Sequence, residues 1–261
     1  NQRIVSSIGS DLSIKAFSLT LHQPYKVHIR NNSSNVISAL STHIDLTQYL
    51  IGFTLQFITN FFISLGILGG IFLVNWQIAF LSGIIISGSY LFVINKTKSI
   101  ILSNSKLITK SINKQVKILQ ESLGGIRDII LDGSQETFKK IYSENDKPRR
   151  LRQANNQYLQ QFPKLILESI TILVITLICI FLINNSTNKN EIFTLLGALA
   201  LGVQKLLPAF QQIYSSWVGI KTNLFSAEEI LILLRQKKYM IKNESIKKIK
   251  FDKLFELKNI T

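Results

Sequence analysis

Residues 46–95 read LTQYLIGFTLQFITNFFISLGILGGIFLVNWQIAFLSGIIISGSYLFVIN and contain no Asp, Glu, Lys or Arg. A single helix of that length would measure about 75 Å at about 1.5 Å per residue, whereas the hydrocarbon layer of a bilayer is about 30 Å thick. The stretch therefore suits two crossings rather than one. Its middle holds Asn75 and Trp76, a polar residue beside an aromatic residue of the type found at membrane interfaces. We expect a helical hairpin that crosses a membrane, turns at Asn75 and crosses back.

The charge distribution favours a membrane protein over a nucleic-acid-binding protein. The chain has 30 Lys and Arg against 15 Asp and Glu, a formal net charge of +15. Most basic residues lie in the middle section, 96–158, and in the tail from residue 205 onward. The aromatic residues lie in the apolar runs instead, so basic and aromatic side chains do not interleave as on a nucleic-acid-binding surface. Because basic residues mark the cytoplasmic side of membrane proteins, the middle section and both termini are predicted to be cytoplasmic.

Two further apolar blocks follow the hairpin and are separated by the polar connector 184–190. Together with the hairpin they predict an all-α membrane protein with four spans. The expected spans are about 48–74, 77–95, 164–183 and 191–218.

The section between the second and third spans has the pattern of a long amphipathic helix. Apolar residues recur at steps of three, four and seven from Ile101 to Ile130, which is the spacing of one helix face. The second span is therefore predicted to continue beyond the bilayer as one helix and to stop at Asp132-Gly133, since glycine favours helix ends. A short segment, 135–145, and a new long helix opened by Pro148 are expected to follow.

Two bends, at about 20–32 and 132–147, are expected at the cytoplasmic ends of these helices. Aromatic side chains stand beside charged residues in both: Tyr25 in the first, Phe138 and Tyr142 in the second. Such side chains either pack each bend against its own helices or dock a soluble partner. The recurrence of the same plan at both bends favours docking.

Cysteine and histidine usage indicates neither a disulfide nor a metal site. The single cysteine, Cys179, lies inside an apolar run and is expected to act as a small buried hydrophobic residue. His22, His28 and His43 have no short ligand spacing and no partner cysteines.

Both ends of the sequence suggest a piece of a longer protein. Asn1 is not a methionine, and no signal-peptide pattern follows it. Residues 236–248 form a basic linker, and apolar residues then alternate with period two over 249–261. That alternation predicts the first strand of a soluble domain that continues past the end of the sequence.

Several stretches resemble the membrane domain of an ABC exporter. IGSDLSIKAFSLTLHQPYKVHIRNNSS at 8–34 resembles the first intracellular loop of the lipid-linked oligosaccharide flippase branch, and ESLGGIRDIILDGSQETFKKIYSENDKPRR at 121–150 resembles its second. FPKLILE at 162–168 and ALGVQKLLPAFQQIY at 200–214 resemble parts of the last two spans. FELKNIT at 255–261 resembles the first strand of a nucleotide-binding domain.

The resemblance implies a transmembrane domain over residues 1–235, from a transporter of a bacterial inner membrane. Its partners would be a second, identical transmembrane subunit, a nucleotide-binding domain and membrane lipid. The bends, with Tyr25, His28, Phe138 and Tyr142, would contact the nucleotide-binding domain. The family has six spans, so two more are expected before Asn1.

The sequence departs from a complete transporter in its nucleotide motifs. It lacks the phosphate-binding motif Gly-x-x-x-x-Gly-Lys-Ser/Thr. We expect no cofactor for this chain alone, and ATP with Mg²⁺ for the full-length subunit, which the resemblance makes a transport ATPase.

Two charges fall inside the expected spans. Lys205 lies fourteen residues from Glu191, about 21 Å along a helix, and Glu168 lies sixteen residues from Asn184, about 24 Å. An unpaired charge at such depth costs about 2.5–3.5 kcal/mol or more, so each needs a partner or a water-filled cavity. Either the two form an ion pair, or Lys205 faces a substrate cavity and attracts an anionic head group. The flippase branch typically has arginine at this position, and lysine lacks its planar fork.

Two nearby residues have alternative interpretations. Lys164 is expected to reach the membrane interface with its charged end, or else to line the cavity mouth. Pro208 removes a backbone hydrogen bond and is expected to kink the last span. The kink either curves the helix around its neighbours, which we favour, or serves the opening of a cavity.

Three functions fit these patterns. The leading one is an ATP-driven exporter or flippase for an amphipathic, anionic lipid-linked substrate. A peptide or drug exporter would share the same architecture. A membrane scaffold or signalling receptor, which relays a signal through its long cytoplasmic helices, is the alternative from another class.

Overall fold

The computed structural model describes the backbone of residues 2–30, 32–74, 76–185 and 189–236. Side chains are described for these residues except Arg30 and several positions within 74–85 and 167–203. Throughout this part of the chain the regular elements are helices, as predicted. They are α1 (Gln2–Leu21), α2 (Tyr25–Arg30), α3 (Ser33–Ser38), the π-helix η1 (Ala39–His43), α4 (Ile44–Val74), α5 (Trp76–Gly124), α6 (Ile126–Asp132), α7 (Gln135–Asn185) and α8 (Lys189–Leu234).

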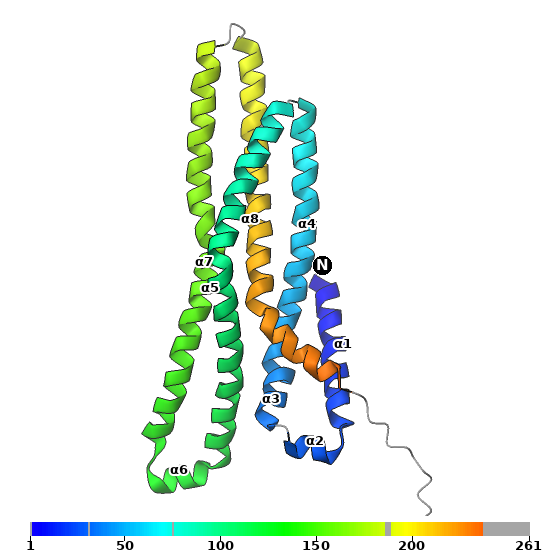
Figure 1. Ribbon diagram of the computed structural model, residues 1–261, viewed down its shortest axis with the longest axis vertical. Helices are drawn as coiled ribbons and strands as arrows, with labels where there is room; N and C mark the ends of the chain where they lie inside the picture. The colour runs from blue at the N-terminus through cyan, green and yellow to red at the C-terminus, as the bar shows by residue number, and fades with distance from the viewer. Residues whose placement is uncertain (1, 31, 75, 186–188, 237–261) are drawn as a thin grey trace, which may run out of the picture.

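The four long helices α4, α5, α7 and α8 run along the length of the molecule (Figure 1). Helix α4 packs most extensively against α8, and α8 also contacts α5 and α7. Helices α5 and α7 pair into one arm closed by α6, while α1 packs on α4 and forms a second arm with α2 and α3. The short helices α2 and α6 lie at the same end of the molecule (Figure 1). We call this the polar end.

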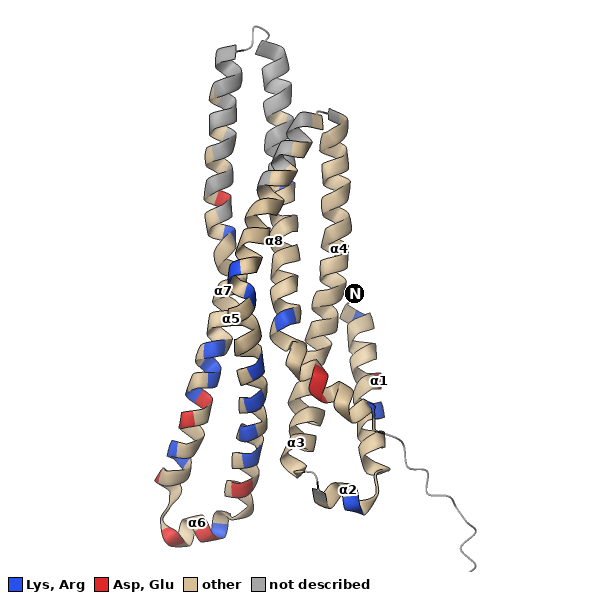
Figure 2. Ribbon diagram, in the orientation of Figure 1, with Lys and Arg blue, Asp and Glu red and all other residues tan. Residues whose placement is uncertain are grey.

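The charged residues separate along the same axis. Lys and Arg follow α5 and α7 toward the polar end, whereas α4 has no charged residue after Asp45 (Figure 2). Large apolar side chains on α4 are exposed, among them Phe62 at 67% and Leu73 at 88%. Among the described residues, the one segment long and apolar enough to cross a membrane by itself lies within Ser33–Leu73, with only 6% of its most apolar window buried. The other three expected spans include residues whose side chains are not described.

The turns far from the polar end lie where the sequence predicts them. Helix α4 ends at Val74 and α5 begins at Trp76. Helix α7 ends at Asn185 and α8 begins at Lys189, inside the polar connector 184–190. In both places polar residues interrupt an apolar run. A turn inside the hydrocarbon would leave backbone groups without hydrogen bonds, so the chain is expected to reverse at these polar residues.

The second bend at the polar end differs from the prediction. The helix expected to reach Leu131 ends at Gly124, and the short helix α6 occupies Ile126–Asp132. The bend therefore lies at 125–134, and most of the expected bend 132–147 belongs to α7. The apolar stripe continues across Gly124-Gly125 without a change of spacing, so periodicity alone hides a break that two glycines make easy.

The prediction that a new helix begins at Pro148 is also wrong. Pro148 and Pro163 both lie inside α7, which is continuous from Gln135 to Asn185. A proline inside a helix removes one backbone hydrogen bond. Near Pro148 the helix is also held to α5, since Asn145, three residues earlier, donates from Nδ2 to the Ser111 carbonyl oxygen at 2.9 Å.

Two clusters of buried side chains hold the arms together. The larger joins α5 to α8 and contains Ile86, Tyr90, Ile101, Leu206, Tyr214 and Val218. The smaller joins α1, η1 and α4 to the C-terminal end of α8 and contains Ala16, Ala39, Ile44, Ile230 and Leu233.

Several expectations lie outside the described residues. These are the basic linker beyond Gln236, the strand at 249–261 and the surroundings of the Cys179 side chain.

Gly133 allows a direct test of the bend at the polar end. It caps α6 with a φ of 65°, and the Ser134 N–H bonds the Ile129 carbonyl oxygen at 3.1 Å. Because a side chain is strained at such a φ, Gly133→Ala should lower the free energy of unfolding by about 1 kcal/mol, seen as a lower Tm in detergent. Gly124→Ala is the control, since a Cβ at this helical position meets nothing within 4 Å. An equal loss in both variants would contradict the assignment of the cap.

Candidate functional site

Hydrogen bonds between uncharged side chains join α5, α7 and α8 near the middle of the molecule. Asn156 of α7 is 2% exposed. Its Oδ1 accepts from Asn104 Nδ2 at 2.9 Å, and its Nδ2 donates to Thr222 Oγ1 at 3.3 Å. Ser105 Oγ donates to the Thr222 carbonyl oxygen at 2.6 Å. One buried amide therefore bridges three helices.

A second layer lies about two to three turns along α8. Tyr90 donates from its hydroxyl to Gln211 Oε1 at 2.9 Å, and Gln211 Nε2 donates to the Gln160 carbonyl oxygen at 3.1 Å. Gln160 Nε2 in turn donates to the Ser215 carbonyl oxygen at 2.9 Å. The two layers set the register of α7 against α8, with residue 156 beside 222 and residue 160 beside 211 and 215.

This register bears on the two charges expected inside the membrane. Eight residues beyond Gln160 on α7 is Glu168, and a similar distance back from the paired residues of α8 is Lys205, so the two lie at similar heights. Both side chains are exposed, and the ion pairs among the described residues do not include one between them. Lys164, one turn beyond Gln160, is exposed as well.

Pro208 lies inside α8, which is continuous on both sides of it. Its side chain is exposed. The clear turn of α8 toward α1 lies near the C-terminal end of the helix (Figure 1), where Ile230 and Leu233 pack with Ala16. A kink at Pro208 stays a prediction.

A cavity of about 230 Å³ opens between α4, α7 and α8, beside the first hydrogen-bonded layer. Five carboxamides line it: Gln153, Asn156, Gln157, Gln160 and Asn223. Sequence reasoning missed these residues, although the signal is present in the stretch QANNQYLQQ at 153–161, with six carboxamides and no charge. Asn and Gln are usually solvated surface residues, so this stretch by itself does not predict a site.

The residues predicted to act at the bends differ in exposure. Tyr25 opens α2 and is 79% exposed, and His28 is exposed on the same helix. Phe138 is half-buried. The hydroxyl of Tyr142 accepts a hydrogen bond from Gln115 Nε2, which ties it to α5.

Helix α6 forms the tip of the α5–α7 arm and exposes apolar side chains that sequence reasoning did not single out there. Ile130 is 60% exposed and Leu131 is 74% exposed. The sequence pattern places Ile130 on the apolar face of one long helix, because the unchanged spacing conceals the break at Gly124-Gly125.

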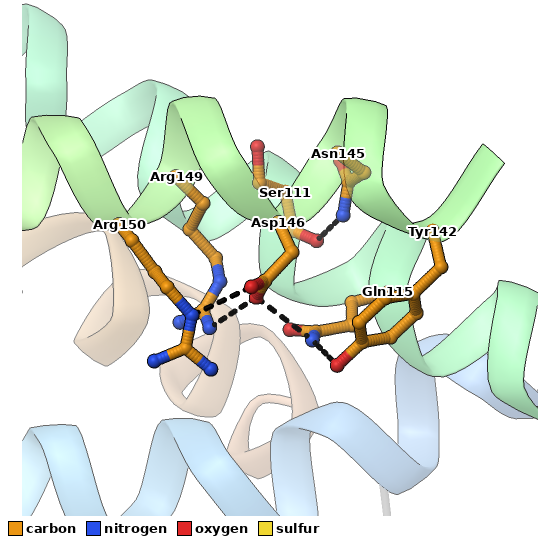
Figure 3. Close-up of polar contacts among 7 residues, drawn as sticks. All are labelled: Ser111, Gln115, Tyr142, Asn145, Asp146, Arg149 and Arg150. Atoms are coloured by element: carbon orange, nitrogen blue, oxygen red, sulfur yellow. Dashed lines mark hydrogen bonds and ion pairs between the residues drawn. The ribbon is translucent and has the colours of Figure 1, made fainter. Parts of the chain in front are cut away.

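Asp146 makes several polar contacts about three helical turns from the start of α7 (Figure 3). Its carboxylate accepts from Arg149 Nη2 at 2.9 Å, from Arg150 Nε at 2.6 Å and from Gln115 Nε2 at 3.2 Å. Hydrogen bonds from Arg149 and Arg150 lower the pKa of Asp146 below its usual value. The carboxylate thus holds two guanidinium groups on α7 and links them to α5.

The lowered pKa of Asp146 gives a pH-dependent stability with a defined sign. A carboxyl with a folded-state pKa below its unfolded value of about 3.9 stabilises the fold above that value, and the contribution is lost as pH falls through the folded-state pKa. Asp146→Asn should therefore lower Tm at pH 7, and the difference from the unmodified protein should shrink toward pH 3. Glu144→Gln, at an exposed position on the same helix, is the control. A Tm difference that is constant with pH would contradict this role of Asp146.

Comparison with known proteins agrees with this architecture. The family model for the ABC transporter transmembrane region matches residues 2–207. Among solved structures, "Structure of a bacterial Atm1-family ABC exporter with ATP bound" matches with a TM-score of 0.69 and 14% sequence identity over 89% of this chain. The match covers 41% of that exporter's chain, so the present chain spans less than half of its length. At this identity the likeness concerns the fold alone. The family match and the shared helical fold show an integral membrane protein that belongs to the ABC transporter transmembrane region family.

Proposed function

We propose that the chain is the membrane domain of an ATP-driven exporter that moves an amphipathic, anionic lipid-linked molecule by alternating access. The observation that carries the choice of substrate is Lys205, an exposed cation on α8 that has no ion-pair partner among the described residues. An unpaired charge at membrane depth requires a water-filled cavity or an anionic ligand. The resemblance of both intracellular loops to the lipid-linked oligosaccharide flippase branch supports the same substrate class.

Lys164 and Glu168 belong to the same proposed cavity. Both are exposed on α7 near the height of Lys205. Lys164 would add a second cation at the cavity mouth, and Glu168 would repel an anion unless water or the second subunit separates them. The proposed function therefore assigns attraction of the head group to the two lysines.

The polar end supplies the proposed coupling to ATP hydrolysis. Helices α2 and α6 both lie there and expose Tyr25, His28, Ile130 and Leu131. Exposed aromatic and apolar side chains on two neighbouring tips suit a protein–protein interface. The partner would be a nucleotide-binding domain that holds ATP and Mg²⁺, in a dimer of two such subunits in a bacterial inner membrane with the polar end in the cytoplasm.

Lys205 is tested by flipping assays on the full-length protein in proteoliposomes. With a fluorescent lipid-linked diphosphate as substrate, Lys205→Ala should reduce the flipping rate about tenfold to a hundredfold, because a charge-assisted hydrogen bond contributes about 1.5–3 kcal/mol. Lys205→Arg should retain activity, since it keeps the charge. Lys98→Ala removes an exposed lysine from α5 and is the control. Unchanged flipping in Lys205→Ala, with normal expression, would exclude Lys205 from the mechanism. Failure of the unmodified protein to flip the lipid-linked diphosphate would instead favour a peptide or drug exporter.

Tyr25 is tested by the coupling of ATP hydrolysis to substrate. Tyr25→Ala removes an aromatic side chain that is 79% exposed in this chain, so folding should be unaffected. If Tyr25 contacts the nucleotide-binding domain, substrate-stimulated ATPase activity should fall several-fold, since aromatic residues dominate the binding energy of interfaces. Tyr158→Ala on α7, at a side chain 57% exposed, is the matched control. Full stimulation in Tyr25→Ala would rule out docking at α2.

A further inference from the structure

The cavity between α4, α7 and α8 combines polarity with an absence of charge. Its described lining contains no carboxylate, ammonium or guanidinium group. Its volume of about 230 Å³ equals that of about eight water molecules at about 30 Å³ each. Cavities for drug-sized ligands measure about 300–1,000 Å³, so this one suits a single ring or head group.

Part of the wall is fixed before any ligand binds. Asn156 is held by Asn104 and Thr222, and Gln160 is held by Ser215. Asn223 Nδ2 donates to the Gly219 carbonyl oxygen at 2.8 Å. Groups already ordered by the protein lose little entropy on binding, so this wall is preorganised.

The mouth of the cavity offers two uncommitted amides. Gln153 and Gln157 lie one turn apart on α7, line the cavity and are exposed. Their side-chain amides form no hydrogen bond with any other described residue. A carboxamide provides two donors and an acceptor, which matches a hydroxyl group that donates and accepts at once.

Helix α4 contributes aromatic side chains to the same cavity. Tyr49 and Phe53 line it, also one turn apart. The Phe53 ring lies so close to the backbone of Gly219 that a Cβ there would overlap the ring. The glycine thus lets α4 and α8 approach closely and sets the position of the aromatic wall.

We propose that this cavity binds an uncharged polyhydroxylated ring, such as a pyranose, carried by the transported molecule. A sugar ring has hydroxyl groups at its edge for the amides of α7 and α8, and apolar C–H faces for Tyr49 and Phe53. An anion would lose its hydration without gaining an opposite charge, which is costly. The inference rests on the proposed function, because it assigns a second part of the same substrate to a place separate from Lys205.

The test measures binding to the full-length protein in lipid nanodiscs without nucleotide. The probe is octyl β-D-glucopyranoside below its micelle concentration, with octyl phosphate and octyl tetraethylene glycol as comparators of equal chain length. The glucoside should bind most tightly. Gln157→Leu should weaken glucoside binding about tenfold, because one hydrogen bond is lost and a polar group of the ligand is left unpaired. Asn155→Leu and Gln161→Leu replace exposed amides on the same helix that do not line the cavity, and should leave binding unchanged.

The aromatic wall has its own pair of variants. Tyr49→Phe keeps the ring and should preserve glucoside binding, whereas Tyr49→Ala should weaken it several-fold. Tyr49 is 61% exposed, so neither variant should impair folding, and size-exclusion profiles verify this. Equal binding by Tyr49→Ala would overturn the role of the aromatic wall and with it the proposed site.

Two results would overturn the choice of ligand. Tighter binding of octyl phosphate, strengthened further by Gln157→Lys, would make the cavity an anion site. Equal binding of octyl tetraethylene glycol, unaffected by Gln157→Leu, would make it a site for the alkyl chain alone. Neither measurement requires transport or ATP hydrolysis. A Lys205→Ala protein that flips normally but still binds the glucoside would therefore refute the proposed anion attraction without refuting the ring site.

Discussion

The structure depends on helices that pass from lipid into water without a break. Helix α5 has 49 residues and α7 has 51, so each is about 75 Å long, more than twice the hydrocarbon thickness of a bilayer. Within lipid every backbone group must be satisfied inside the helix, and a continuous helix meets this requirement. The same helices also need side-chain contacts to stay together, and hydrogen-bonded amides and hydroxyls join α5, α7 and α8.

Charges and amides have separate places in this arrangement. Asn104, Asn156 and Gln211 are buried and hydrogen-bonded, whereas Lys205 and Glu168 are exposed. Burying a neutral amide with its partners satisfied costs far less than burying an ion. A neutral network can therefore set the register of three helices, while the side chains of Lys205 and Glu168 stay exposed.

Some features of the fold followed directly from sequence, and others depended on contacts distant in the chain. The reversal between α4 and α5 was predictable, because a polar residue in the middle of a long apolar stretch is the favoured place for a helical hairpin to turn. The continuity of α7 through Pro148 was not, since the proline signal is local, whereas the contact that holds this part of α7, the bond from Asn145 to Ser111, involves α5. The break at Gly124-Gly125 was missed because an apolar stripe of unchanged spacing suggested one helix. The carboxamides at 153–161 are evident in the sequence, but their number alone does not distinguish a solvated helix face from the wall of a cavity.

The sequence by itself determined the class of the protein, the number of helical hairpins in the chain and the family that the chain resembles. The class and the number of hairpins depend on hydrophobic runs compared with the thickness of a bilayer, and the resemblance depends on local stretches of residues; both can be taken from the chain in one dimension. Tertiary structure alone decided which side chains meet: Asn156 with Asn104 and Thr222, Tyr142 with Gln115, and Phe53 with Gly219. The physical reason is that a hydrogen bond or a ring contact requires two atoms within a few ångströms, and the register between antiparallel helices that brings them together is set by packing rather than by the spacing of residues along either one.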